Sequence, residues 1–335
     1  MSNDHEAQRS IQLSISGLPD NQAVDLGEAF RLAIFEFGNT LDLRRLTQII
    51  ITGDFAGTIA ELSERLGSAI SYTQEEYGTA GAKLISLPSG EDFEMVLVFT
   101  AQIVEDLILK EETPEAQEKV LTAIHSLHHE LCHVHDSNKR ADVVPVLATK
   151  GIALAGKAVV LFPLAEACWS EYFANYLSSG TATTDAISTQ SLLFRDALTR
   201  AKAAVDQEIL AYRLHADIHR LMGMVRRHGE WLPKMAAYLI GFVHGTNNSL
   251  ASLSPESAET LSGSYFEETW NELAAALAQM REGYVSEWTE DLTVYDGLYA
   301  AIERYYATLG MILSTAENGH CHIDIPLRPE TTPAN

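Results

Sequence analysis

Two histidines stand four residues apart, in the segment His129-Glu130-Leu131-Cys132-His133, inside a stretch with strong helical signals. Thr113 can cap the start of a helix, and Pro114 suits its first position. The apolar residues that follow recur with helical spacing: Val120, Leu121, Ile124, Leu127, Leu131 and Val134. The sequence therefore predicts a helix from Pro114 to about Asp136, with both histidines on one face, one turn apart.

This spacing lets two imidazole rings reach one ion. Zinc accepts imidazole nitrogen readily and prefers four ligands. Glu130 follows the first histidine, so its carboxylate points roughly a quarter turn away and can reach a metal-bound water without binding the metal. The pattern His-Glu-x-x-His predicts a zinc site at His129 and His133 with Glu130 as general base. The alternative is a histidine-rich, solvated helix face.

With this motif the sequence resembles the zincin metallopeptidases, over about Pro114 to Leu177. In the metzincin branch of that family, a glycine and a third histidine follow the motif at fixed distances. This chain has Asp136 and Lys139 at those two positions, so that branch is excluded. The gluzincin branch instead takes its third zinc ligand from a glutamate on a later helix.

The segment Ala165–Leu177 fits such a helix, and the resemblance implies Glu171 as its ligand. A carboxylate buried in this apolar setting without a cationic partner would cost on the order of several kcal/mol. Glu166 is the alternative ligand. Asn175, one turn after Glu171, stands where gluzincins often have an acidic residue that orients a histidine ligand, and its amide oxygen can accept the same imidazole N–H.

The resemblance implies a zinc-dependent metallopeptidase with one Zn²⁺ ion, acting on a protein or peptide substrate. A metal-activated water would attack the peptide bond, with Glu130 as general base. The first alternative is a catalytically silent or regulatory protein on the same fold, whose helical half recognises a protein partner. The second is a helical interaction protein that carries the motif by chance.

The remaining pattern predicts an α+β fold, with a zincin-like domain over residues 1–180 and a helical domain over 181–326. The residues from 327 to 335 form a flexible tail in this interpretation. The predicted strands are Ile11–Ser16, Gln48–Thr52, Ala82–Leu87 and Glu94–Phe99. The further predicted helices are Val24–Phe37, Ala56–Leu66, Gln190–Arg227, Trp231–Val243, Tyr265–Met280 and Thr293–Ile312.

In zincins an edge strand near the active helix binds extended substrate by backbone pairing. Glu94–Phe99 is the candidate for that strand in this chain. The alternative is that Glu94–Phe99 is an ordinary core strand.

Charge and composition restrict the partners. A formal charge of −23 disfavours nucleic acid and anionic membrane surfaces. Three cysteines argue against a disulfide framework, and the polar N-terminus lacks the apolar core of a secretory signal. The apolar stretch Val143–Ala165 contains Lys150 and Lys157, so we interpret it as a buried or groove-lining connection. A cytoplasmic protein is expected; the oligomeric state is not predicted.

Several other side chains are candidates for secondary roles. His125 and His128 flank the motif as polar groups of the helix face. Candidates for stabilising an oxyanion are Tyr238, His244, His219, Tyr212 and His215. His320-Cys321-His322 either binds a second zinc ion or forms a strand near the C-terminus.

Overall fold

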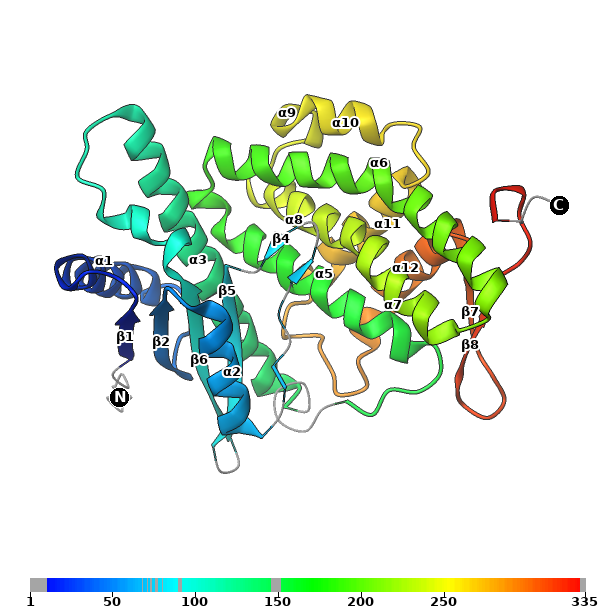
Figure 1. The fold of residues 1–335 in the computed structure, drawn as a ribbon, viewed down its shortest axis with the longest axis horizontal. Coiled ribbons are helices and arrows are strands. Elements are labelled where there is room, and N and C mark those ends of the chain that lie inside the picture. The colour runs from blue at the N-terminus through cyan, green and yellow to red at the C-terminus, as the bar shows by residue number, and fades with distance from the viewer. Residues whose placement is uncertain are drawn as a thin grey trace. The chain divides into compact units, whose positions relative to one another are not determined.

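The computed structural model describes residues 11–67, 69–70, 72, 74–75, 78–79, 81–89, 92–145 and 152–331. The chain divides into two compact units (Figure 1). The first consists of Met1–Gly151 and Thr181–Asp185, and the second of Ile152–Gly180 and Ala186–Asn335. The class is α+β with a small mixed sheet, as predicted.

The first unit alternates strands and helices along the chain. Its strands are β1 (Gln12–Ser16), β2 (Leu46–Thr52), β3 (Gln74–Glu75), β4 (Gly78–Thr79), β5 (Ala82–Ser89) and β6 (Asp92–Thr100). Its helices are α1 (Asp20–Gly38), α2 (Phe55–Leu66) and α3 (Pro114–Val143), with the 3-10 turns η1 (Ala101–Ile103) and η2 (Glu105–Ile108). The predicted strands and helices of this region are all present, with ends that differ by a few residues.

Strand β6 is an interior strand of a four-stranded sheet with the order β1-β2-β6-β5 (Figure 1). β1, β2 and β6 run parallel, and β5 is antiparallel to β6. Val96 and Val98 pack against α2 in one apolar cluster. The ring of Phe99, on the opposite face, lies 5.6 Å from the ring of Phe30 on α1. Burial on both faces explains the uninterrupted apolar run of this strand.

The prediction that Glu94–Phe99 is a substrate-binding edge strand is wrong. These residues lie in β6, which pairs with β2 on one side and with β5 on the other. Both rows of backbone hydrogen-bonding groups are therefore taken, and none remains for a peptide. The edge strand on this side of the sheet is β5, followed in sequence by β6.

Helix α3 continues past its predicted end near Asp136, because the residues that follow are buried through polar contacts. Asp136, Asn138 and Arg140 are all buried. The side chains of Asp136 and Arg140, one turn apart on the helix, form an ion pair with 2.8 Å between Asp136 Oδ2 and Arg140 Nε. Buried polar residues leave no apolar periodicity in a sequence, so the last turns of α3 could not be read from it.

The connection between α1 and β2 ties these last turns to the sheet. The backbone N–H of Asp42 donates to Nδ1 of His135 over 2.8 Å, and Asn138 Nδ2 donates to the Asp42 carbonyl over 2.7 Å. Arg45 donates to the Asn138 carbonyl and to Asp142, each at 3.3 Å. Because these contacts come from residues just before β2, they set the rotation of α3 about its axis.

The second unit is mainly helical. Its helices are α5 (Ala158–Ser178), α6 (Thr184–His215, whose first two residues belong to the first unit), α7 (Ile218–His228), α8 (Trp231–Gly245), α9 (Leu250–Leu253), α10 (Pro255–Leu261), α11 (Glu267–Glu282) and α12 (Asp296–Thr308). The turns η3 (Ser179–Thr181), η4 (Thr293–Tyr295) and η5 (Pro329–Thr331) and the hairpin strands β7 (Ile312–Thr315) and β8 (Cys321–Asp324) complete the described elements.

Two predicted helices of this unit were too long. The predicted helix Gln190–Arg227 is split after His215, where Ala216 has φ 56° and Asp217 caps α7 by accepting from two backbone N–H groups. The predicted helix Thr293–Ile312 ends at Thr308, since Gly310 turns the chain at φ 95° into β7. In both places the sequence contains a residue that favours a helix boundary, Asp217 in the first and Gly310 in the second. The prediction gave more weight to the apolar periodicity that continues past these residues.

The apolar stretch Val143–Ala165 is in part helical rather than a connection. Its last eight residues form the start of α5, and residues 146–151 lie outside the described part of the chain. In the described residues no helix combines the length and the apolar character needed to cross a membrane. At the other end of the chain, Arg328 donates to the carbonyls of Ala307 and Thr308, which holds the residues near η5 against α12.

Helix α8 approaches α5 closely along two glycines one turn apart. A Cβ on Gly241 would lie 2.6 Å from the carbonyl oxygen of Tyr172, and one on Gly245 would lie 2.6 Å from that of Tyr176. Only glycine permits this backbone contact. The Asn175 amide adds a hydrogen bond to the Tyr238 carbonyl over 3.1 Å. The turn of α5 that contains Glu171 is therefore held by backbone contacts as well as by apolar packing.

We expect the variant Gly241→Ala to lower the free energy of unfolding by about 1–3 kcal/mol, because its methyl group must push the two helices apart. The matched control is Gly223→Ala in α7, where an added Cβ meets nothing within 4 Å. That control should raise stability by about 0.5–1 kcal/mol through helix propensity. Urea unfolding followed by circular dichroism measures both, and equal effects would contradict the close approach.

A second prediction concerns the Asp136–Arg140 pair. The substitution Asp136→Asn should cost about 3–5 kcal/mol, because it removes the negative charge from a buried ion pair. Asp196 and Arg200 form a pair with the same spacing on α6, but with both side chains exposed. Asp196→Asn should cost less than about 1 kcal/mol. A similar loss of stability in the two variants, measured by urea unfolding, would show that burial of the first pair is unimportant.

Candidate metal centre

The two motif histidines direct their ring nitrogens at each other. His129 Nε2 and His133 Nε2 lie 3.0 Å apart, and the rings are nearly perpendicular. His129 is buried and His133 is partly buried. Tetrahedral zinc with Zn–N bonds of 2.0–2.1 Å separates two nitrogen ligands by about 3.4 Å, so a small opening of the pair accommodates the ion. The pair is thus arranged for chelation by helix geometry alone.

The apolar side of α3 fixes the direction of this pair. Leu127, Leu131 and Val134 are fully buried, so the helix cannot rotate without exposing them. Cys132 is buried on the same helix, and its burial, with the charges of Asp136 and Glu130, raises the pKa of the thiol. Because Cys132 is completely buried, it packs with the apolar side of α3.

Glu130 is partly exposed, between the two histidines in the sequence. Among the described residues its carboxylate has no hydrogen-bond or ion-pair partner. An unpaired carboxylate beside the imidazole pair is available to accept a proton from a water molecule. The helix places it about 100° around the axis from His129, beside the pair rather than on its line.

His125 and His128 have partners other than a metal-binding group. Their Nδ1 atoms lie 3.2 Å and 2.9 Å from the hydroxyl of Thr181. The ring of His128 also stacks on Phe37 of α1, with 4.2 Å between centroids. Thr181 is the residue of this region that sequence reasoning missed, because an isolated threonine 53 positions from His128 carries no local signal.

Glu171 lies in the second unit, on α5. Its neighbours Trp169, Tyr172 and Phe173 are almost completely buried, as the sequence predicted for an apolar helix. Glu171 itself is partly buried, and its Oε2 atom is inaccessible to solvent. The expected role of the Asn175 amide oxygen as a histidine partner stays a prediction. The amide nitrogen of the same side chain donates to the Tyr238 carbonyl on α8.

Glu166, the alternative third ligand, is engaged within the second unit. The hydroxyl of Tyr295, which is fully buried, donates to its Oε2. The Tyr295 ring also packs on Phe162, 5.3 Å between centroids. A carboxylate that accepts a hydrogen bond from a buried tyrosine has a structural function in the core, which weakens Glu166 as a ligand candidate.

The candidates for oxyanion stabilisation all lie in the second unit. His244 Nδ1 is 3.0 Å from the Tyr172 hydroxyl, and burial, followed by the charge of Arg281, lowers the pKa of His244. Which of the two groups donates depends on the tautomer of the ring. Tyr212 packs edge-on against His215, and His219 lies in the first turn of α7. None of these contacts distinguishes one candidate from the others.

Cys321 and His322 begin strand β8, and His320 forms an isolated β-bridge with Gly156 just before it, in agreement with the simpler of the two predictions. Within the described residues, no group of three possible metal ligands includes any member of it. Alternation along a strand turns Cys321 away from the two histidines. A second zinc site at the triplet therefore has no structural support.

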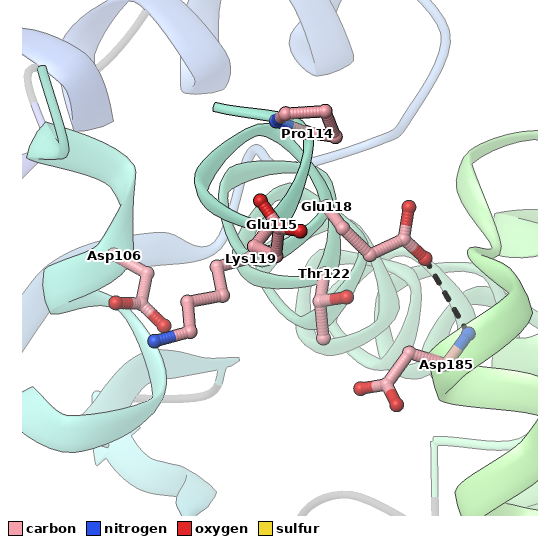
Figure 2. A pocket seen from close by; sticks show the side chains of 7 residues that line it. All are labelled: Asp106, Pro114, Glu115, Glu118, Lys119, Thr122 and Asp185. Atoms are coloured by element: carbon pink, nitrogen blue, oxygen red, sulfur yellow. Dashed lines mark hydrogen bonds between the residues drawn. The ribbon is translucent and has the colours of Figure 1, made fainter. Parts of the chain in front are cut away.

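A hollow of about 540 Å³ lies beside the start of α3 (Figure 2). Its lining is mostly acidic and consists of Asp106, Pro114, Glu115, Glu118, Lys119, Thr122 and Asp185. In Figure 2 the Lys119 ammonium points toward Asp106, and Glu118 accepts from the backbone N–H of Asp185. Four carboxylates around one ammonium group make this hollow unsuited to anions.

Comparisons of the chain with family models, with curated proteins and with solved structures gave no match.

Proposed function

We propose that this protein is a zinc-dependent metallopeptidase. The observation that carries the proposal is the His129–His133 pair, with two imidazole nitrogens 3.0 Å apart on a helix that is buried along one side. Two rings at this distance share either one proton or one cation, because two protons between them would repel. Zinc, among common cellular cations, is the one that imidazole pairs at this spacing favour most in hydrolytic enzymes.

The proposed third ligand is Glu171. His129, His133 and Glu171 offer one ligand atom each, two ring nitrogens and one carboxylate oxygen, which could hold a metal ion. Two histidines and one glutamate leave zinc a fourth position for water, as a hydrolytic site needs. The engagement of Glu166 by Tyr295 further supports Glu171 over its alternative.

In this proposal zinc, when bound, supplies a Lewis acid that lowers the pKa of a water molecule and polarises the substrate carbonyl. Glu130 takes the proton of the attacking water and later delivers it to the leaving amine. The absence of another partner for its carboxylate among the described residues supports this role. Of the two strands β5 and β6, only β5 lies at an edge of the sheet, so its outer row of backbone groups is the one that an extended peptide could pair with.

The first test is the variant Glu130→Gln. It should retain zinc, because Glu130 is not a ligand, and should lose about 10²–10⁴-fold in peptide turnover, because the amide cannot accept the proton. Metal analysis of the purified chain and cleavage of a peptide library measure the two quantities. Glu115→Gln, in the exposed first turn of the same helix, is the matched control and should cleave at the wild-type rate.

Unchanged cleavage by Glu130→Gln would exclude the general-base role. Zinc binding without any cleavage by the wild-type chain would favour the silent scaffold instead. A wild-type chain that binds no zinc would refute the proposal.

The second test compares Glu171→Gln with Glu166→Gln. Loss of groups that merely orient a ligand weakens zinc binding about 10–100-fold, so loss of a direct ligand should weaken it by more than about a hundredfold. Glu171→Gln should show that loss in a competition titration with a chromogenic chelator. Glu166→Gln should bind zinc as the wild type does; the reverse result would make Glu166 the ligand.

A further inference from the structure

The segment Thr181–Asp185, between α5 and α6, belongs to the first unit although the helix before it belongs to the second. We call this segment the clasp. It begins at the last residue of η3, three residues after α5 ends at Ser178. The clasp therefore joins the helix that carries Glu171 to a set of contacts on α3.

The clasp contacts α3 at successive turns. Thr183 Oγ1 lies 2.9 Å from Thr122 Oγ1, and Thr183 is buried. The backbone N–H of Asp185 points at Glu118 Oε1 at 3.5 Å, a weaker contact. Positions 118, 122 and 125 of α3 are spaced by four and three residues, so the clasp follows one face of the helix.

Thr181 contacts two histidines of α3, His125 and His128, at 3.2 Å and 2.9 Å. A hydroxyl has one proton, so it can donate to only one of the two rings. The other ring must carry its own proton on Nδ1 and donate it to the hydroxyl oxygen. These two histidines are one turn and one residue before His129, so the clasp is attached at the turn of α3 that leads into the metal ligands.

Chain geometry limits how far Glu171 can be from this attachment. From Glu171 to Ser178 the helix rises about 10 Å, and the 3-10 turn to Thr181 adds about 6 Å. In sequence, 42 positions separate His129 from Glu171, whereas ten separate Glu171 from Thr181. The probability that a flexible loop closes falls as about the 3/2 power of its length. Replacing a separation of 42 positions by one of ten should therefore make closure of the ligand set about tenfold more favourable.

We propose that Thr181 and Thr183 are positioning residues, whose hydroxyls anchor the α5 chain on α3 and so deliver Glu171 to the histidine pair. This inference rests on the proposed zinc site. It also assigns a function to His125 and His128, which hold the clasp instead of the ion.

The test uses the full chain with Thr181→Val and Thr183→Val together, which removes both hydroxyls and keeps the side-chain shape. The zinc dissociation constant, from chelator competition, should rise about tenfold. Hydrogen exchange of the zinc-free chain should become faster in a peptide that covers residues 181–185. The single variant Thr181→Val should show a smaller rise in both the zinc dissociation constant and the exchange rate. It replaces the double variant in the test if the double variant does not fold.

Two further variants separate anchoring from general stability. Thr181→Ser with Thr183→Ser retains the hydroxyls and should restore wild-type zinc affinity. Thr199→Val removes an exposed hydroxyl that donates to the Arg195 carbonyl of its own helix, and should change neither quantity. His129→Ala should abolish zinc binding and leave the exchange of the clasp at the wild-type rate.

Faster exchange in the valine variant with unchanged zinc affinity would overturn the inference while leaving the zinc site intact. Equal loss of affinity in the valine and serine variants would overturn it too, since the hydroxyls would then not be the cause. A wild-type chain without zinc affinity would refute the proposed function and the positioning role with it.

Discussion

Two imidazole nitrogens that face each other at 3.0 Å form the contact on which the candidate site depends. Two lone pairs at that distance repel, and so do two N–H groups, so the arrangement requires one shared positive species. A hydrogen bond from one ring to the other would satisfy this requirement, and so would a zinc ion bound by both rings. The histidine pair is part of α3, so contacts that hold α3 within the first unit, such as those of Asp42 with His135 and Asn138, also hold the pair.

Helix α3 is held largely by polar contacts beyond the motif. The Asp136–Arg140 pair is buried, and Asp42 bonds both His135 and Asn138. Buried ion pairs add little net stability compared with apolar packing, but they tolerate only one arrangement of their partners. A helix fixed in this way cannot slide by a turn, which is the precision that a two-histidine site needs.

In the second unit, close backbone packing has the same effect on α5. Gly241 and Gly245 let α8 approach the carbonyls of Tyr172 and Tyr176, the first of which directly follows Glu171. A helix at such short range cannot rotate without a collision. The two helices that carry the proposed ligands are thus rigid for different reasons, one through buried charges and the other through glycines.

The sequence by itself determined that His129, Glu130 and His133 share one helix, and that Glu171 lies in an apolar one, because these properties depend on spacing within a few turns. Only the tertiary structure decided that β6 is interior, that α3 extends to Val143, and that Thr181 bonds two histidines of α3. Such contacts join residues far apart in the chain. No local periodicity encodes a partner 53 positions away, because what stabilises the contact is the fold that brings the two residues together.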